Sequence, residues 1–514
     1  MSAQTPSSGR ARRVRPEQNA PLLALLVPLC AGALALRPTP AAAGRADVAG
    51  YVRVGTRPDF QGGGGTLGYW NLYGRLLNER PYAALELKYD VLERTAASQN
   101  PWTSVHMRIE GGAVSRATPE GGSLAGLQMS QLYVRAGNVL LPNVTWQVGT
   151  LHQYFGDLGL YDMRPAQIFF ETVGASARYE NDVVDVVVGF GDSGFFLRPE
   201  AYSTVLTPGG MARVRLGDYV ELGGGGMLRY EPKAEGNRNA PHVTPGIDYE
   251  QWVRGEVVQQ FLAENPMRPQ NFPRPQAVDA RSWKGIGYLG FGGFGPVRWN
   301  NLFASVERLH PTPTAVEDWQ GQSYTLYVTE LTDERTVTLI GDELQLRVIP
   351  QRFDFVLAGL WGRHTNGDNS VAPSDENRRY KSLVGRGQIY LTDTVHWLTE
   401  SSIAKEVSEN GNTFREHKDS IFANTGGQPD TRGLETGDTD TRITWQGKAG
   451  VVLNPLGPGV YSRPSLRFLY GVQHSNQNNA FGNAFVETVD QYNFFGNVEQ
   501  HWHQVVSLEA EAWF

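Results

Sequence analysis

Cysteine is almost absent from this sequence, which has one such residue, Cys30, in 514. Because Cys30 lies in an N-terminal segment that we expect to be removed, the remaining chain has no thiol for disulfides or thiolate catalysis. Common catalytic and metal motifs are also missing: no His-Glu-x-x-His, paired cysteine or nucleophile elbow occurs, and the ten histidines are scattered. We therefore expect no catalytic residue, no metal and no cofactor.

Long apolar runs and an excess of positive charge are lacking as well. Beyond residue 43 no run of 18 apolar residues occurs, which excludes a protein that spans a membrane with helices. The net charge of -7 and a pI near 5.9 give no reason to expect nucleic acid as a partner. Two glycine runs, 62–65 and 223–226, lack the Lys-Ser/Thr of a phosphate loop, so relief of crowding is the simpler interpretation.

The N-terminus has the order of a secretory signal peptide. Four arginines between residues 10 and 15 precede an apolar run over 21–36, and three alanines follow at 41–43. A membrane anchor is the alternative. The run is interrupted by Pro28 and is shorter than the roughly 20 residues that a spanning helix needs, so the pattern favours a cleaved signal.

A lipid anchor at Cys30 is a further alternative for this segment. It is disfavoured because Leu29, directly before the cysteine, is bulky where a lipoprotein signal has a small residue. No shift in composition divides the rest of the chain. We expect a signal peptide over 1–43 and one mature unit over 44–514.

Alternation of apolar and polar residues dominates the mature chain. After Arg442 one face carries Ile443, Trp445, Gly447, Ala449, Val451 and Leu453, and the other carries Thr444, Gln446 and Lys448. The stretches 465–473 and 352–361 have the same pattern. A polar face of this kind lines a wet lumen, although on alternation alone a soluble β-sandwich with its charges in bulk water stays open.

The last strand decides between these alternatives. An apolar set, Val506, Leu508, Ala510, Ala512 and Phe514, alternates to the end of the sequence with Ser507, Glu509, Glu511 and Trp513. A strand of about ten residues matches a tilted crossing of the bilayer, and a terminal aromatic suits an interfacial girdle. The sequence therefore predicts an all-β, transmembrane antiparallel barrel in a bacterial outer membrane, surrounded by outer-membrane lipid.

The number of strands follows from the tight turns, since barrels of this kind have short periplasmic turns and long external loops. Turn-forming residues cluster at eight places: 78–81, 141–143, 180–182, 217–218, 295–296, 350–351, 392–393 and 454–455. With both termini periplasmic, eight turns predict 18 strands. The longest polar inserts, roughly 233–282 and 405–441, become external loops.

Several blocks of the sequence resemble the maltoporin family of carbohydrate-selective porins. The longest, VTWQVGTLHQYFGDLGLYDMRPAQIFFETVGAS from residue 144, is similar to that family's third-loop region. Others are GYVRVG from residue 50, YGRLLNERPYAALELK from 73, VYSRPSLRF from 460 and the terminal EAEAWF. The resemblance implies an 18-stranded homotrimer with an inward-folded third external loop, and passive diffusion of saccharides such as maltodextrins.

The resemblance also implies a path of aromatic residues along which sugar rings move. Matched by position, the path contains Tyr51, Tyr82, Tyr461 and Trp513, with Trp299 or Phe303 as one further member. Apolar faces of sugar rings stack on aromatic planes, while their hydroxyls bind polar side chains beside them. Packing or a membrane girdle is the alternative role for each aromatic, but alternation places Trp513 on the lumen side.

The implied polar partners of the sugar are Arg53, Arg75, Glu86, Asp157 and Asp162. Three positions depart from the family: Met129 and Phe155 stand where it has arginines, and Arg164 replaces a tyrosine, so the constriction is chemically altered. Two rival functions stay open. One is a general or ion-selective porin for other small hydrophilic solutes, and the other is a barrel enzyme such as a lipid hydrolase.

Overall fold

The computed structural model describes a large part of the predicted mature chain. The described residues are 44–56, 72, 74–76, 82–94, 99–111, 128–193, 206–231, 280–309, 314–319, 322–327, 335–366, 378–408, 441–476 and 501–514. The predicted signal peptide, the glycine run 62–65 and most of the two long inserts lie outside these residues.

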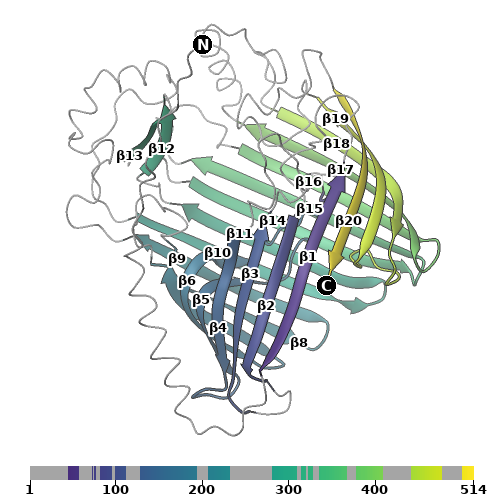
Figure 1. Ribbon diagram of the computed structural model, residues 1–514. Coiled ribbons are helices and arrows are strands. Elements are labelled where there is room, and N and C mark those ends of the chain that lie inside the picture. Colours follow the sequence, from purple (N-terminus) through teal and green to yellow (C-terminus); the bar gives the residue numbers. More distant parts are fainter. Residues whose placement is uncertain are drawn as a thin grey trace, which may run out of the picture.

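Eighteen antiparallel strands form one closed sheet, as the sequence predicts (Figure 1). They are β1 (Arg45–Thr56), β2 (Tyr82–Leu92), β3 (Trp102–Gly111), β4 (Gln128–Gly137), β5 (Val144–Tyr154), β6 (Gln167–Glu180), β7 (Val184–Asp192), β8 (Gly209–Leu216), β9 (Val220–Glu231), β10 (Ala280–Phe294), β11 (Val297–Leu309), β14 (Arg335–Ile349), β15 (Phe353–Asn366), β16 (Arg378–Tyr390), β17 (Val395–Ser408), β18 (Thr441–Leu453), β19 (Ser465–Ser475) and β20 (Trp502–Trp513). A separate hairpin consists of β12 (Thr314–Trp319) and β13 (Gln322–Tyr327). No helix in the described part of the chain is long and apolar enough to cross a membrane.

The barrel closes between its first and last strands, which lie side by side in Figure 1. β1 pairs with β2 on one side and with β20 on the other, where Tyr51 lies opposite Trp513. Gly50 and Phe514 exchange two backbone hydrogen bonds, of 2.8 and 3.1 Å. Closure leaves no free sheet edge at this seam, which is what a hydrocarbon environment requires.

Short connections lie at one end of the barrel and long ones at the other. The eight short ones span 93–101, 138–143, 181–183, 217–219, 295–296, 350–352, 391–394 and 454–464. Several contain residues with positive φ, such as Asn143 (60°), Gln351 (59°) and Gly217 (62°), which explains why turn-forming residues gather there. Seven of the predicted turns fall in these connections.

The first predicted turn is wrong. Residues 78–81 belong to the long connection between β1 and β2, outside the described residues, and the first short connection is 93–101. Turn-forming residues occur in long loops as well as in tight turns, so composition alone does not separate the two. The strand count is nevertheless right because one misplaced turn took the place of another.

The burial pattern of the wall is the reverse of that in a soluble protein. In β18 the predicted lumen face, Thr444, Gln446 and Lys448, is buried, whereas Ile443 and Trp445 on the opposite face are exposed. The outward aromatics form two groups. Trp283, Trp361, Trp445 and Trp502 lie toward the long connections, and Tyr179, Tyr219, Phe294, Trp397 and Phe468 lie toward the short ones.

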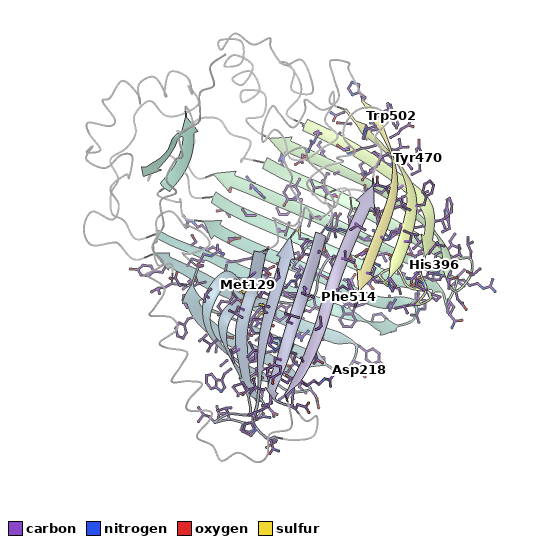
Figure 2. The ribbon with its side chains drawn as sticks, viewed as in Figure 1. Met129, Asp218, His396, Tyr470, Trp502 and Phe514 are labelled. Carbon is purple, nitrogen blue, oxygen red and sulfur yellow. The ribbon has the colours of Figure 1, made fainter. Side chains whose placement is uncertain are left out.

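An apolar outer band between two rows of aromatic residues is the surface that a bilayer covers. Figure 2 shows Tyr470 and Trp502 on β19 and β20, and both side chains are about half exposed. A β-sandwich with its charges in bulk water would bury these rings and expose the charges instead. The protein is therefore an outer-membrane β-barrel.

Candidate functional site

The connection between β5 and β6, residues 155–166, is a compact segment with a buried tip. The Phe155 amide donates to the Ala166 carbonyl at 3.0 Å, and the Leu158 amide donates to the Met163 carbonyl at 2.8 Å. The side chains of Leu158, Leu160 and Tyr161 are fully buried. Burial this complete requires contact with other parts of the barrel, since so short a segment cannot cover itself.

Those contacts are with the inner face of strands β14 to β16. The Leu160 amide donates to the Glu343 carboxylate at 2.8 Å, on β14. The Tyr161 hydroxyl lies 3.0 Å from the Ser382 hydroxyl on β16 and donates to the Ala358 carbonyl on β15 at 3.3 Å. This connection is the third long one in chain order, the position at which the maltoporin resemblance implies a loop inside the pore.

Two further segments meet the 155–166 connection. From the β1–β2 connection, the Arg75 amide donates to the Leu160 carbonyl at 2.6 Å, and the Ser382 hydroxyl bonds the Leu72 carbonyl. From the β18–β19 connection, the Tyr461 hydroxyl donates to Glu343 at 2.8 Å. We call these three segments, residues 72 with 74–76, 155–166 and 454–464, the lumen inserts.

Glycine at position 159 is a steric requirement of this arrangement. A Cβ built there would lie 2.8 Å from the Tyr461 ring, which is too close for a real contact. The backbone of the insert 155–166 therefore packs against the ring of Tyr461 from the insert 454–464. Glu343 joins the same two inserts through the Leu160 amide and the Tyr461 hydroxyl.

Glu511 on β20 is a second point at which the lumen inserts are fastened. Its buried carboxylate accepts from Arg75 at 2.5 Å and from the Tyr51 hydroxyl at 2.7 Å. Arg463, from the β18–β19 connection, lies 2.6 Å from it, and Arg467 pairs with the same carboxylate. Burial, together with the charge of Arg467, lowers the pKa of Arg463 to about 10, although Glu511 opposes that shift.

Three of the four predicted path aromatics come together beside Glu511. The ring centroid of Tyr51 lies 5.7 Å from that of Tyr82 and 6.3 Å from that of Trp513. The Arg53 guanidinium lies 5.9 Å from the centroids of both tyrosine rings. We call Tyr51, Tyr82 and Trp513 the aromatic trio. It forms because β20, β1 and β2 are consecutive around the barrel.

The fourth predicted aromatic lies elsewhere. Tyr461 packs against the buried cluster of the lumen inserts and bonds Glu343 on β14, and no described ring contact joins it to the aromatic trio. Trp299 and Phe303 are also separate: Trp299 donates to the Asn301 side chain at 2.8 Å, and Phe303 is fully buried. Neither Trp299 nor Phe303 has a described ring contact with the aromatic trio.

A second aromatic group, which the sequence did not predict, accounts for one glycine run. Phe155 stacks on Tyr288 at 5.5 Å, and Tyr288 lies 5.2 Å from Phe303. A Cβ at Gly223 would lie 2.9 Å from the Phe155 ring, so this glycine makes room for it. Relief of crowding, the interpretation given above to the run 223–226, is confirmed at Gly223.

Two of the predicted polar residues, Asp162 and Glu86, form ion pairs of uneven exposure with arginines that contact the aromatic trio. Arg53 lies 4.0 Å from Asp162, whose side chain is 52% exposed against 13% for the arginine. Arg108 lies 2.9 Å from Glu86, whose side chain is 53% exposed against 24%. In both pairs water reaches the carboxylate more than the guanidinium.

Several important partners were missed because they lie on other strands. Arg108 donates to the Tyr82 hydroxyl at 2.9 Å and pairs with Glu110 at 2.8 Å. No signal within β3 links these residues to β2, since only the strand register places them opposite one another. Among the described residues, no three His, Cys, Asp or Glu side chains gather as a metal site would need.

Asp157 lies in the connection rather than beside the aromatic trio. Its backbone carbonyl accepts from the side-chain amide of Asn301 at 3.1 Å. Burial raises the pKa of the Asp157 carboxyl above its ordinary value, and Asp162 adds to the shift, while Arg164 opposes it. Arg164 also lies 4.3 Å from the centroid of the Tyr154 ring.

Met129 does not belong to the lumen, so the prediction that it alters the constriction is wrong. It pairs with Ile109 and is 54% exposed on the outer face of β4. A register shift follows Arg108, which pairs with Gln131, and moves the facing of the next positions. Such a bulge reverses the side to which later residues point, and periodicity alone does not reveal it.

The fold of this chain is similar to those of several solved outer-membrane proteins. The chain is similar to the outer-membrane channel DcaP of Acinetobacter baumannii (8% identity, 93% of this chain and 99% of that one, TM-score 0.43). It is also similar to Wzi, an outer-membrane protein involved in group 1 capsule assembly in Escherichia coli (12%, 91% and 84%, TM-score 0.38). An anion-selective porin from Comamonas acidovorans is a third such structure (8%, 92% and 100%, TM-score 0.39).

At these identities and TM-scores the similarities add nothing to the barrel described above. No protein-family model matches the sequence, and no curated protein matches it.

Proposed function

We propose that this barrel is a porin for passive diffusion of small hydrophilic solutes. The observation that carries the proposal is the polar inner wall of β2 to β9, where the ion pairs stay partly exposed. The Arg178 side chain is 32% exposed beside Asp185, and Arg213 is 19% exposed beside the same carboxylate. Charged side chains that keep contact with water line an aqueous path rather than a packed core.

We propose further that the path prefers saccharides, as the maltoporin resemblance implies. The aromatic trio offers ring faces for stacking, and Glu86, Asp162 and Arg53 lie beside it as partners for hydroxyl groups. The lumen insert 155–166 would narrow the path against β14 to β16. Assembly as a homotrimer is part of the same proposal and rests on the resemblance alone.

The main rival is an ion-selective porin without sugar preference. It is favoured by the exposed carboxylates of Glu86 and Asp162, which would attract cations whether or not a sugar binds. Block of the open channel separates the two. Millimolar linear oligosaccharide should reduce the single-channel current if sugars bind at the aromatic trio, whereas current that ignores sugar but discriminates between ions would support the rival.

One arrangement of residues resembles the catalytic group of a barrel enzyme. The Ser104 hydroxyl lies 2.9 Å from His106 Nε2 on the same face of β3, with Asp90 opposite Ser104 on β2. The Ser104 side chain is fully buried, however, so a lipid ester could not reach it. Transport is therefore the function that the geometry supports best.

A further inference from the structure

Four cations on the outer wall have no acidic cross-strand neighbour among the described residues. Arg363 on β15 is directly opposite Arg379 on β16, and Lys381 on β16 is directly opposite Lys405 on β17. All four side chains are exposed, and each alternates along its strand with buried, inward-facing residues. We call them the outer basic cluster.

The pairing within this cluster is unfavourable by itself. Side chains directly opposite one another in antiparallel strands lie about 5 Å apart, and like charges in such positions destabilise the sheet. The remaining cross-strand neighbours of the four, within the described strands, are Thr338, Trp361, Val407 and Ile443, none of which is acidic. A negatively charged partner would make this arrangement favourable.

The height of the cluster identifies the kind of partner. Each of the four lies within four residues of the strand end that leads into a long connection, 367–377 or 409–440. Lys381 lies opposite Trp361, which belongs to the outward aromatic row at that end. Long connections mark the external side of such barrels and aromatic rows mark the membrane interface, so the cluster lies at the headgroups of the outer leaflet.

We infer that the outer basic cluster binds the phosphate groups of a phosphorylated glycolipid of the outer leaflet, of the lipid A type. Each of the two arginines can bind a phosphate through two parallel hydrogen bonds. The ammonium groups of the two lysines beside them add positive charge. An acyl-bearing partner fits better than a soluble anion because Leu383 and Ile403 continue the exposed apolar wall directly below the lysines. This inference concerns the outer wall and does not depend on what passes through the lumen.

The first test measures lipid binding to the purified protein in phosphatidylcholine nanodiscs, with diphosphoryl lipid A as the probe. The double variant Lys381→Gln, Lys405→Gln should bind the probe roughly thirty-fold more weakly than the parent. The matched control, Arg298→Gln with Arg352→Gln, removes two exposed charges near the short connections and should change binding less than about twofold. Unchanged single-channel conductance and heat-modifiable gel migration would show that the variants are folded.

The second test uses the sign of a stability change. In phosphatidylcholine alone, Lys405→Gln should raise the unfolding temperature because it removes a like-charge pair, whereas with lipid A present it should lower that temperature because it removes a ligand contact. Parent-like lipid A binding by the lysine double variant would overturn the inference. So would displacement of the probe by equimolar inorganic phosphate, or equal binding of a glycolipid without phosphate.

Discussion

Two parts of the barrel wall differ in how far their inward-facing charged side chains are buried. On β16 to β20 the inward-facing ionic side chains are almost completely buried, among them Arg386, Glu400, Lys448 and Glu511. On β2 to β8 the inward-facing ion pairs remain partly exposed, as Glu86–Arg108 and Asp185–Arg178 do. The two walls share strand geometry and polarity, so the difference arises from what lies against them.

The lumen inserts account for the difference. On the wall of β16 to β20 they bond to Ser382 on β16 and to Glu511 on β20, and a Cβ at Gly74 would lie 2.6 Å from the Glu400 side chain on β17. They also bond to Glu343 and Ala358 on the neighbouring strands β14 and β15. A wall covered in this way becomes a polar core, in which an ion pair is fixed and an unpaired charge is costly. The uncovered wall stays wet, and its charges are screened and available to a passing solute.

The largest effect should come from breaking a buried pair on the covered wall. Glu400 lies 2.7 Å from Arg386 and 2.8 Å from Lys448, so Glu400→Gln removes a carboxylate that two buried cations contact. We expect a loss of about 3–5 kcal/mol in the free energy of unfolding. Glu86→Gln on the exposed wall should cost only about 0–1 kcal/mol. Urea unfolding in lipid vesicles measures both, and equal losses would contradict the contrast between the walls.

A smaller effect is expected at the aromatic trio on the exposed side. Trp513→Ala removes a stacking surface worth about 0.5–1.5 kcal/mol, so oligosaccharide should block the channel roughly two- to tenfold less tightly. Phe514→Ala is the neighbouring control: it should impair assembly and leave block unchanged in the channels that insert. Normal insertion of Trp513→Ala with parent-like block would favour the ion-selective rival.

Ion selectivity should shift modestly when the exposed carboxylates are removed. Glu86→Gln with Asp162→Asn takes two water-exposed charges from beside the aromatic trio, so the channel should become less cation-selective by several millivolts of reversal potential in a tenfold salt gradient. Asp182→Asn, in the short connection 181–183, changes charge away from the trio. A shift as large in this control would mean that the trio does not set selectivity.

The smallest effect concerns pH and the insert 155–166. The raised pKa of Asp157 means that the folded insert holds this proton more tightly than the unfolded chain does. Stability from this group is therefore present at low pH and is lost as pH rises through the raised pKa. We expect open-channel current noise to grow over that rise, and Asp157→Asn to abolish the change. If the current noise of the Asp157→Asn variant kept the same pH dependence, another titrating group would be its cause.

Strand positions and facing were largely predictable because side chains alternate with a fixed period of two. That period placed Thr444, Gln446 and Lys448 in the lumen and, with barrel closure, made neighbours of Tyr51 and Trp513. It failed at Met129, where a bulge shifts the register by an amount that the local sequence does not reveal.

Contacts between distant segments were beyond such reasoning. Tyr461 was matched to the sugar path by its sequence neighbours, yet its position depends on Glu343 and Gly159, more than a hundred residues away. Arg108 and Glu511 gained their roles only once the strands were placed in register. Resemblance identified candidate residues, and packing decided which of them share a site.

Glu511 also sets an order of events during assembly. It lies on β20, the strand that joins β1 to complete the ladder, and its carboxylate holds both Arg75 and Arg463. Neither insert can acquire this anchor before the final strand has arrived. The closing strand of the barrel therefore also carries the group that holds these two inserts together, so an error in the pairing of β20 with β1 should disturb the interior as well as the wall.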